Sequence, residues 1–352
     1  MKRLFIICIL CLLLACSDNS VSQAPAPSSY VPSHYETIPR TTPTEETVVI
    51  STPTPEPTET PTEEPTATPE STEVPTPEPT GLCGNRFPDV FTDTPVLTEN
   101  SYSDSGLSIT ITRYDDNFEI CRHIVVYYVA DVYVQDIERF ETAAATDFSS
   151  YDIDYVRNIA ERNDAMLAVS GDYFNFTDGK YANKGLVIRN GVLYWDRLDE
   201  DHDLCVLYRD GVMKTLEAGT FTTEEIIAQD PWQTWQFGPA LFDESGEPKG
   251  KGQFNSSITG IQPRCAIGYY EPGHYCFVVV DGRNEGYSLG AEFWELAPIM
   301  KKLGCTAAYN LDGGLSAQIE FNGKTQNRNF GGRFIGDIIC FRAGEGYSPY
   351  HK

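Results

Sequence analysis

Short apolar runs separated by glycine-containing turns fill the chain from residue 81 onward and predict strands paired as hairpins. Three pairs of runs flank a two-residue Asn-Gly or Asp-Gly turn, a strong signal for a tight hairpin. The predicted hairpins cover 185–195, 204–214 and 319–324. Most of this part of the chain is therefore expected to be β-structure.

Apolar residues recur at helical spacing in two further segments, 152–162 and 292–303. Their apolar faces carry Ile153, Val156 and Ile159 in the first segment and Phe293, Leu296, Met300 and Leu303 in the second. Pro298 should kink the second helix or restrict its first turn. Many strands and few helices predict a mixed α+β fold.

The first sixteen residues read as a sorting signal. Lys2 and Arg3 precede an unbroken apolar run of 11 residues, Leu4 to Leu14, which is too short to span a bilayer. The run ends in Leu-Leu-Ala-Cys16, which resembles the lipobox of bacterial lipoproteins. The resemblance implies that Cys16 is diacylated and that the protein is anchored to the membrane outside the cytoplasm, since two acyl chains suffice for stable anchoring. An ordinary secretory signal cut nearby is the alternative.

Residues 17–80 are expected to form an unfolded linker. Residues 41–80 contain 14 Thr, 10 Pro and 9 Glu but no Lys or Arg. Such a segment lacks the apolar surface needed to offset the entropy of ordering, and its prolines favour an extended polyproline II conformation. We interpret it as a stalk that carries the folded body, which comprises an N-terminal β-rich part (81–150), a main domain (151–341) and a tail (342–352).

Charge and cysteine content exclude several classes of function. Residues 81–352 hold 40 acidic and 23 basic side chains, a net charge of −17, whereas nucleic-acid grooves and anionic lipid surfaces require basic patches. Seven cysteines remain in this body, so at least one cannot pair within the chain. No Cys-x-x-Cys pair occurs among these seven, which excludes a zinc ribbon or a thioredoxin-type motif in the body.

Three apolar runs each end in an aspartate next to glycine. The aspartates are Asp172, Asp281 and Asp312. The last two runs are joined by the 292–303 helix, so they read as a strand–helix–strand unit with parallel strands. Because parallel strands end at the same edge of a sheet, Asp281 and Asp312 are expected to converge, and Asp172 is a third candidate for this edge.

Arginine and glycine accompany these aspartates. Arg264 opens the strand before the unit and Arg283 follows Asp281. Glycines such as Gly313 and Gly314 let the backbone approach a ligand and direct N–H groups at an anion. Carboxylates beside guanidinium groups and backbone donors suit a sugar that carries phosphate. The alternative for each Asp-Gly pair is an ordinary turn.

An ordered set of motifs over 151–341 resembles the phosphodiester glycosidase family. The most specific motif, Asn310–Ala317, reads Asn-Leu-Asp-Gly-Gly-Leu-Ser-Ala where the family has Asn-Leu-Asp-Gly-Gly-Gly-Ser-Ala. The other matching segments are 170–174, 237–241, 264–268, 281–282, 293–297 and Arg333. The resemblance implies a hydrolase that cleaves the bond between a sugar's anomeric carbon and a phosphodiester oxygen, so that a phosphomonoester remains.

The resemblance also implies roles for individual residues. Asp312 and Asp281 would be the carboxylates nearest the anomeric carbon. Glu295 would be either a general acid/base or the cap of its helix. Phosphate would be held by Arg264, Arg333 and the backbone of Gly313 and Gly314. Sugar hydroxyls would contact Asn310, Ser316 and Asp172, although the first two could instead brace the loop.

Three residues depart from the family pattern. Ser170 replaces Asn, Asp172 replaces Gly and Leu315 replaces the third Gly of the Asn310 motif. Leu315 adds bulk where the backbone would face the ligand. The Asp172 charge would repel phosphate unless an arginine or a divalent cation lay beside it; otherwise no cofactor or metal is expected.

Two other functions remain open at the level of sequence. The domain could be a glycan-binding module without catalysis, given the changes at Ser170 and Leu315. It could also be a metal-dependent phosphodiesterase that breaks the P–O bond, although its five histidines show no ligand spacing. In each case the expected partner is a glycan or sugar phosphate, and the membrane is contacted through the lipid anchor alone.

Overall fold

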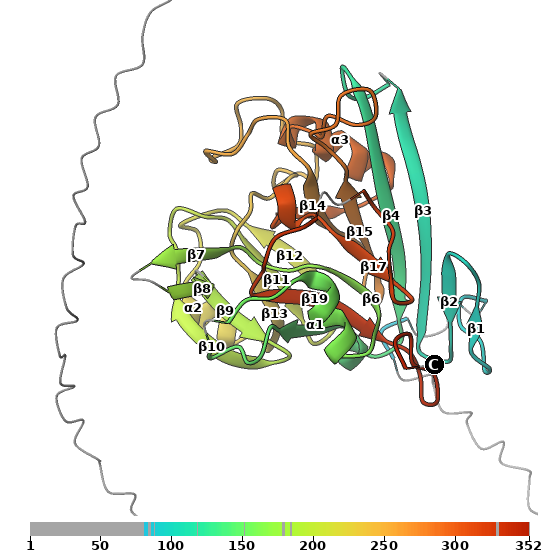
Figure 1. Cartoon of the computed structure of the whole chain (residues 1–352). Coiled ribbons are helices and arrows are strands. Elements are labelled where there is room, and N and C mark those ends of the chain that lie inside the picture. Colours follow the sequence, from blue (N-terminus) through green and yellow to red (C-terminus); the bar gives the residue numbers. More distant parts are fainter. Residues whose placement is uncertain are drawn as a thin grey trace, which may run out of the picture. The chain divides into compact units, whose positions relative to one another are not determined.

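The computed structural model describes residues 81–351 apart from 84–85, 88, 118, 151, 178–179, 184 and 329–330, with the backbone alone at 117, 175–177 and 180–183 (Figure 1). The chain divides into two units, Met1–Thr72 and Glu73–Lys352, and every described residue belongs to the second. The signal segment 1–16 with Cys16 and the linker 17–80 lie outside the described residues. Within those described, no helix is both long and apolar enough to cross a membrane.

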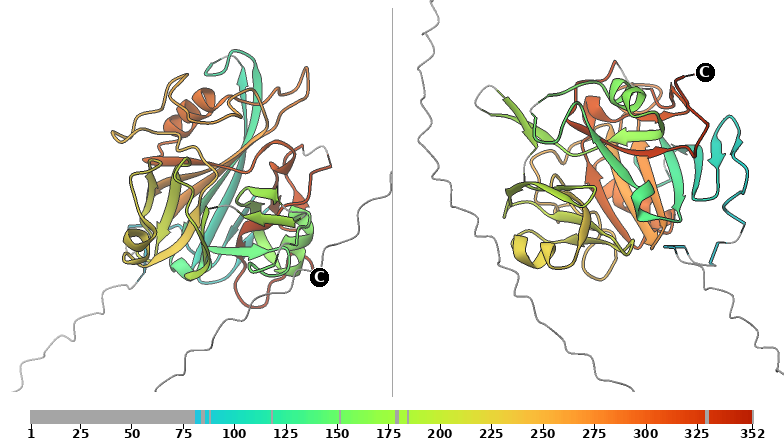
Figure 2. Two further views of the ribbon diagram at one scale, coloured as in Figure 1. Left: turned by 90° about the vertical axis from the view of Figure 1, so that its left-hand side faces the viewer. Right: turned by 90° about the horizontal axis from the view of Figure 1, so that it is seen from below.

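The larger sheet has seven strands, and each pairs antiparallel with its neighbours. The order is β1 (Val96–Leu97), β2 (Ser101–Ser103), β3 (Leu107–Asn117), β4 (Ile124–Val134), β15 (His274–Val280), β14 (Arg264–Glu271) and β16 (Ala307–Leu311). The long strands β3 and β4 form one flank of the domain (Figures 1 and 2).

The two strands of the strand–helix–strand unit run in the same direction, as expected, but they do not pair with each other. β15 and β16 both pair antiparallel with β14, so they run the same way and end at the same edge. However, β14 lies between them, and no parallel pair forms. Helix α3 (Phe293–Lys302) makes the crossover, runs through Pro298 and packs its apolar face on the sheet.

A second sheet of five strands contains β6 (Ala165–Ser170), the strand that leads to Asp172. Its order is β18 (Lys324–Thr325), β17 (Ile319–Phe321), β6, β19 (Asp337–Arg342) and β5 (Glu141–Ala144). Helix α1 (Val156–Arg162) packs on this sheet. The two sheets meet where the Asp312 N–H donates to the Gly171 carbonyl at 3.2 Å. This junction brings the ends of β6 and β16 together.

The first helix is shorter than its sequence pattern predicts. Periodicity suggested 152–162, but Asp154 pairs with Ile335 in an isolated bridge, in which the Asp154 N–H donates to the Ile335 carbonyl at 3.0 Å. This backbone contact holds Asp154 extended, so the helix begins at Val156.

All three predicted hairpins form. They are β9 (Gly185–Arg189) with β10 (Val192–Arg197), β11 (Leu204–Tyr208) with β12 (Met213–Leu216), and β17 with β18. Asn190 and Gly191 have φ of 50° and 75°, as the tight turn between right-twisted strands requires. The remaining elements are β7 (Phe174–Thr177) with β8 (Lys180–Asn183), β13 (Pro231–Trp235), α2 (Thr223–Ile227), and the 3-10 helices η1 (Ile137–Arg139) and η2 (Gly314–Ser316).

A hydrophobic core joins the two sheets. Buried residues of β3, β4, β6, β14, β15 and β19 form one cluster with Phe140, which lies between η1 and β5. The rings of Phe140, Phe277 and Phe341 contact one another within it. All seven cysteines of the body are buried with free thiols. The sulfurs of Cys276 and Cys305 lie 3.5 Å apart. The mixed, β-rich fold predicted from sequence is confirmed.

Candidate active site

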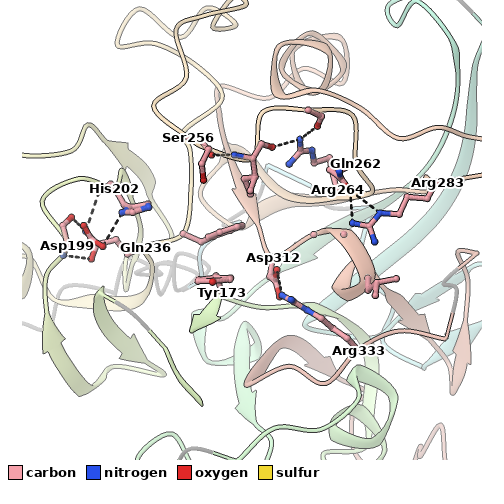
Figure 3. Close-up of a pocket in the computed structure, with 17 residues that line it drawn as sticks. Tyr173, Asp199, His202, Gln236, Ser256, Gln262, Arg264, Arg283, Asp312 and Arg333 are labelled. Carbon is pink, nitrogen blue, oxygen red and sulfur yellow. Dashed lines mark hydrogen bonds and ion pairs between the residues drawn. The ribbon is translucent and has the colours of Figure 1, made fainter. Parts of the chain in front are cut away.

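A cavity of about 710 Å³ opens at the sheet edge where β14 begins and β15 and β16 end. Figure 3 shows Asp312 and Arg333 on one side of it, Asp199 and His202 on the other, and Tyr173 between them. Two carboxylates line the cavity, Asp312 and Asp199, and so do three arginines, Arg264, Arg283 and Arg333. An anionic ligand in this cavity would therefore be met by more positive than negative side chains.

Asp312 follows β16 and is 3% exposed. Nη2 of Arg333 donates to both of its carboxylate oxygens, at 2.9 and 2.7 Å. Burial raises the pKa of Asp312, and the opposing charge of Arg333 limits the rise. Arg333 is 40% exposed and its Nε donates to Ser316 Oγ at 2.5 Å. Thus Ser316, predicted to contact sugar or to brace the loop, holds the arginine that faces the cavity.

Gly313 and Gly314 bring the backbone to the cavity wall. A Cβ on Gly313 would lie 2.8 Å from the Pro263 carbonyl oxygen, too close for any side chain. Gly314 has φ of 62°, and its N–H donates to the same Pro263 oxygen at 2.8 Å. Among the described residues, none accepts a hydrogen bond from the Gly313 N–H. This donor can serve an anionic ligand.

Arg264 lies in the cavity wall but is 2% exposed. Its guanidinium stacks 3.9 Å from the Phe293 ring centroid and donates to the carbonyls of Ala291, Ile258 and Gly260. Burial lowers its pKa to about 10, so it stays charged at neutral pH. Nη1 donates to none of the described residues. Arg264 therefore both fixes the 258–260 loop and contributes positive charge to the wall.

Arg283 was noted in the sequence without an assigned role, and it also lines the cavity. Its Nε and Nη2 donate to Gln262 Oε1 at 2.9 and 2.6 Å. A Cβ on Gly314 would lie 3.3 Å from Nη2, so the guanidinium covers the glycine backbone. Its φ of 58° is uncommon for a residue other than glycine.

The opposite wall comes from residues that sequence reasoning missed. Tyr173 stacks on Phe237 with ring centroids 4.8 Å apart and planes 18° apart. His202 Nδ1 lies 3.0 Å from Asp199 Oδ2. Both wall pairs line the cavity. Tyr173 and Phe237 lay in matched motifs but were given no role, whereas Asp199 and His202 lie in a polar loop with no distinguishing spacing.

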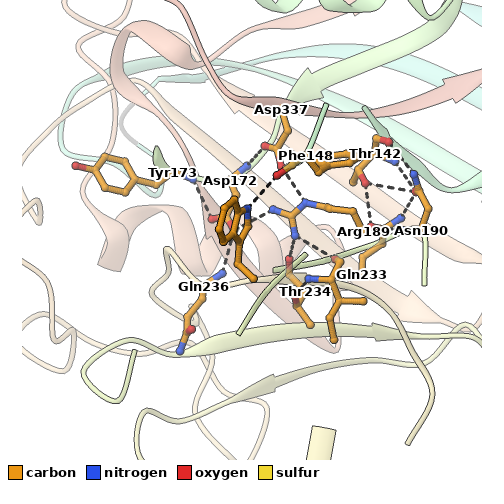
Figure 4. A network of polar contacts seen from close by, with 12 residues as sticks. Thr142, Phe148, Asp172, Tyr173, Arg189, Asn190, Gln233, Thr234, Gln236 and Asp337 are labelled. Atoms are coloured by element: carbon orange, nitrogen blue, oxygen red, sulfur yellow. Dashed lines mark hydrogen bonds and ion pairs between the residues drawn. The ribbon is translucent and has the colours of Figure 1, made fainter. Parts of the chain in front are cut away.

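Asp172 is buried beneath this wall and does not line the cavity. Arg189 bridges it to Asp337: Nη2 donates to Asp172 at 3.1 Å and Nε donates to Asp337 at 2.9 Å (Figure 4). The Asp172 carboxylate also accepts the backbone N–H groups of Tyr173 and Gln236. The predicted sugar contact is therefore not formed, because Asp172 supports the wall from behind.

The positive partner that the sequence demanded for Asp172 is the Arg189 guanidinium, which occupies the place considered for a divalent cation. Within the described part of the chain, no three His, Cys, Asp or Glu side chains are grouped to hold a metal.

Asp281 and Asp312 do not share the main cavity, contrary to expectation. Asp281 is 1% exposed and lines a separate narrow cavity. Its carboxylate accepts from Asn327 Nδ2 at 3.1 Å, the Arg328 N–H at 3.2 Å and the Tyr287 hydroxyl at 2.9 Å. These hydrogen bonds turn the carboxylate toward the 327–328 segment and away from Asp312's cavity.

Glu295 and Asn310 also lie outside the lining of the main cavity. Glu295 accepts the Glu292 N–H at 2.9 Å as part of a capping box at the start of α3, the second of its two predicted roles. Asn310 donates from Nδ2 to the Gly238 carbonyl at 2.8 Å, and so braces the loop beside the cavity rather than a sugar.

Comparison with known proteins matches the chain to one family. A sequence model described as phosphodiester glycosidase matches residues 163–342. The N-acetylglucosamine-1-phosphodiester alpha-N-acetylglucosaminidase of Bos taurus is 36% identical over 182 residues, 48% of this chain and 33% of that protein. An uncharacterized SPbeta prophage-derived protein of Bacillus subtilis, YomE, is 26% identical over 202 residues, 56% of this chain and 31% of that protein. The chain thus spans about a third of the length of these relatives.

Solved structures share the fold. The catalytic domain of the zebrafish N-acetylglucosamine-1-phosphodiester alpha-N-acetylglucosaminidase, auto-inhibited by its pro-peptide, superposes with a TM-score of 0.56 at 20% identity, covering 68% of this chain and 84% of that one. A hypothetical protein from Synechocystis gives a TM-score of 0.52 at 14% identity, covering 67% and 62%. With half of its residues matched by the family model, from the residue after α1 to the end of the last strand, the chain belongs to the phosphodiester glycosidase family.

Proposed function

We propose that this domain hydrolyses the bond between a sugar's anomeric carbon and a phosphodiester oxygen, releasing the sugar and leaving a phosphomonoester. The observation that carries the proposal is the pairing of Asp312 with Arg333 on the wall of a cavity whose other arginines are Arg264 and Arg283. The carboxylate can stabilise the positive charge that develops on the anomeric carbon, and the guanidinium groups can stabilise the phosphate that leaves as an anion.

Phosphate would be held between the arginines and the glycine backbone. The half-exposed Arg333 can turn a guanidinium edge to phosphate oxygens while its Nη2 stays on Asp312. The Gly313 N–H supplies a neutral donor nearby. Because phosphate is already a good leaving group, charge stabilisation matters more here than strong acid assistance. Asp312 would stabilise the oxocarbenium-like transition state.

The sugar would occupy the part of the cavity bounded by Tyr173 and Phe237, whose stacked rings offer an apolar surface. Across from Asp312, the His202–Asp199 pair replaces Asp281 as the second candidate for proton transfer. With its carboxylate 3.0 Å from Nδ1, Asp199 would stabilise the positive charge that the imidazole gains when Nε2 accepts a proton from water.

The test is the Asp312→Asn variant. We expect it to fold normally and to lose about a hundredfold or more in rate, since one lost transition-state contact of this kind costs on the order of 3 kcal/mol. The assay follows both released sugar and phosphomonoester from UDP-N-acetylglucosamine and from the methyl phosphodiester of N-acetylglucosamine 1-phosphate. Asp281→Asn is the matched control, expected to keep the catalytic rate.

An Asp312→Asn variant that retains activity would overturn the assignment of Asp312. Wild-type protein that binds these compounds without releasing either product would instead indicate a glycan-binding module.

We also propose, from the sequence, that acyl chains on Cys16 anchor the mature protein to the outer face of the cell membrane. Cys16→Ser should then move the protein from the membrane fraction to the soluble fraction, because the serine oxygen cannot replace the lipidated sulfur. Continued membrane retention of the variant would contradict the anchor.

A further inference from the structure

A second cavity lies next to the candidate active site. It has a volume of about 590 Å³ and lies between α1 and the segment that follows β18. Arg157 and Asn158 line it from the helix, and Asn327 and Arg328 line it from the segment. We call it the outer cavity. None of the roles assigned so far uses it.

A small intermediate cavity borders both the outer cavity and the active-site cavity. This third, small cavity of about 10 Å³ shares Arg283, Gly314 and Leu315 with the active-site cavity. It shares Asn327 and Arg328 with the outer cavity. The outer cavity therefore lies close to the active-site cavity, and the proposed phosphate site at Gly313–Gly314 lies beside the intermediate cavity.

Arginine side chains line the intermediate and outer cavities, although the protein is acidic overall. Arg283 and Arg328 line the intermediate cavity, and Arg328 and Arg157 line the outer cavity. Among the described residues, no carboxylate lines the outer cavity; Glu320 lies behind it, where it accepts hydrogen bonds from the lining residues Gln318 and Thr325. Asp281 does line the intermediate cavity, but it is turned to Asn327, the Arg328 N–H and Tyr287.

Polar and aromatic groups complete the outer cavity. Arg328 is fixed by its stacking 3.8 Å from the Tyr287 ring centroid. Asn158 is held by Asp154, which accepts its Nδ2 at 2.7 Å. Tyr155 lines the cavity and packs on Phe334 with ring centroids 4.5 Å apart, and the two residues are 38% and 46% exposed. Exposed rings beside amides and guanidiniums are typical of sites that bind anionic glycans.

We propose that the outer cavity binds the acceptor side of the substrate, and that this substrate is an oligomer or polymer of sugars joined by phosphodiesters. The proposal rests on the proposed function. The terminal sugar occupies the active-site cavity, and its phosphate lies at Arg333, Gly313 and Arg283. The next sugar and its phosphate then reach Arg328 and Arg157. Hydrolysis of the terminal anomeric bond consumes one water, frees one sugar and leaves a phosphomonoester on the shortened chain.

The experiment compares substrates of different length. Synthetic oligomers of one to four N-acetylglucosamine 1-phosphate units, joined through phosphodiesters to O6, are compared with the single-unit methyl phosphodiester. The variant is Arg157→Gln/Arg328→Gln. The control is Arg197→Gln/Arg209→Gln, which removes two arginines that are also exposed and line neither cavity. Thermal unfolding of each variant verifies that it is folded.

We expect wild-type kcat/KM to rise with oligomer length. The cavity variant should lose about tenfold or more of kcat/KM on the longer oligomers, in line with two lost charge-assisted contacts, and keep its value on the single-unit substrate. The control should match wild type on all substrates. Equal losses on short and long substrates, or no loss on either, would overturn the outer site.

Failure of the proposed function would look different. In that case wild type would hydrolyse none of the substrates. Fluorescence anisotropy with a labelled tetramer would then test whether the outer cavity binds the oligomer. Weaker binding by the cavity variant than by the control would support the outer site without hydrolysis. Equal binding would overturn it.

Discussion

At the scale of single residues, a buried ion group supports the wall of the active-site cavity. Asp172, Arg189 and Asp337 are at most 1% exposed, and they place two carboxylates on one guanidinium. Such groups are costly to break because any unpaired member remains buried. Asp172 in turn binds the N–H groups of Tyr173 and Gln236, so this charge cluster determines where two lining residues lie.

This cluster predicts a distinct dependence of stability on pH. Burial raises the pKa of Asp172 from 3.8 to about 7; Arg189 opposes the rise and Asp337 adds to it. Between pH 4 and 7 the folded chain therefore binds more protons than the unfolded chain. The resulting stabilisation is present below about pH 4 and is lost as the pH rises through about 7. Relative to Asp172→Asn, the wild-type free energy of unfolding should fall over this range and level off above it.

Urea unfolding at a series of pH values measures this difference. Asp104→Asn is the control with the opposite sign, because hydrogen bonds from Gly106 and Arg139 outweigh burial and lower the pKa of Asp104. Stability from Asp104 is present above about pH 4 and is lost as the pH falls. A wild-type advantage over Asp172→Asn that grows from pH 4 to 7 would contradict the assignment.

At the scale of elements, the position of Glu295 at the start of α3 indicates a structural role for this residue and not a catalytic one. Its carboxylate caps the helix by accepting the Glu292 N–H, and it lies outside the main cavity. We expect Glu295→Ala to lower the free energy of unfolding by about 1 kcal/mol, and Glu295→Gln to restore most of it, because glutamine also completes a capping box.

Steady-state kinetics on a sugar phosphodiester provides the second measurement for this pair of variants. Both should retain the wild-type kcat at a temperature where each is folded. A large loss of kcat in Glu295→Gln, with stability intact, would restore Glu295 to the catalytic group.

The hairpins and the strand order show which features of the fold could be predicted from the sequence and which could not. The hairpins followed from local turn chemistry, since Asn190-Gly191 imposes its conformation on its own neighbours. The insertion of β14 between β15 and β16 did not, because strand order depends on pairing between distant segments. Asp281 shows why a motif alone does not locate a site residue. Its motif matches the family, yet its carboxylate is oriented by a hydrogen bond from Asn327, 46 residues away.

At the scale of the whole molecule, the first described residues complete the domain and define where a shortened chain can begin. Leu82 packs against the main core, and its N–H donates to the Gln135 carbonyl at 2.8 Å. Cys83 is fully buried and its thiol donates to the Val134 carbonyl at 3.3 Å. Arg86 forms a 2.8 Å ion pair with Glu271. The folded unit thus includes the short segment between the Pro-rich region and β1.

These contacts predict a sharp boundary. A chain beginning at Gly81 should have the same Tm as the full mature protein, because the Thr- and Pro-rich residues before it offer no core. A chain beginning at Asp89 loses the burial of Leu82 and Cys83, about 2–4 kcal/mol, and should melt roughly 5–10 °C lower. Scanning calorimetry of the three proteins checks both expectations. A lower Tm for the Gly81 chain would show that the preceding residues stabilise the domain, and an unchanged Tm for the Asp89 chain would show that its first segment adds nothing.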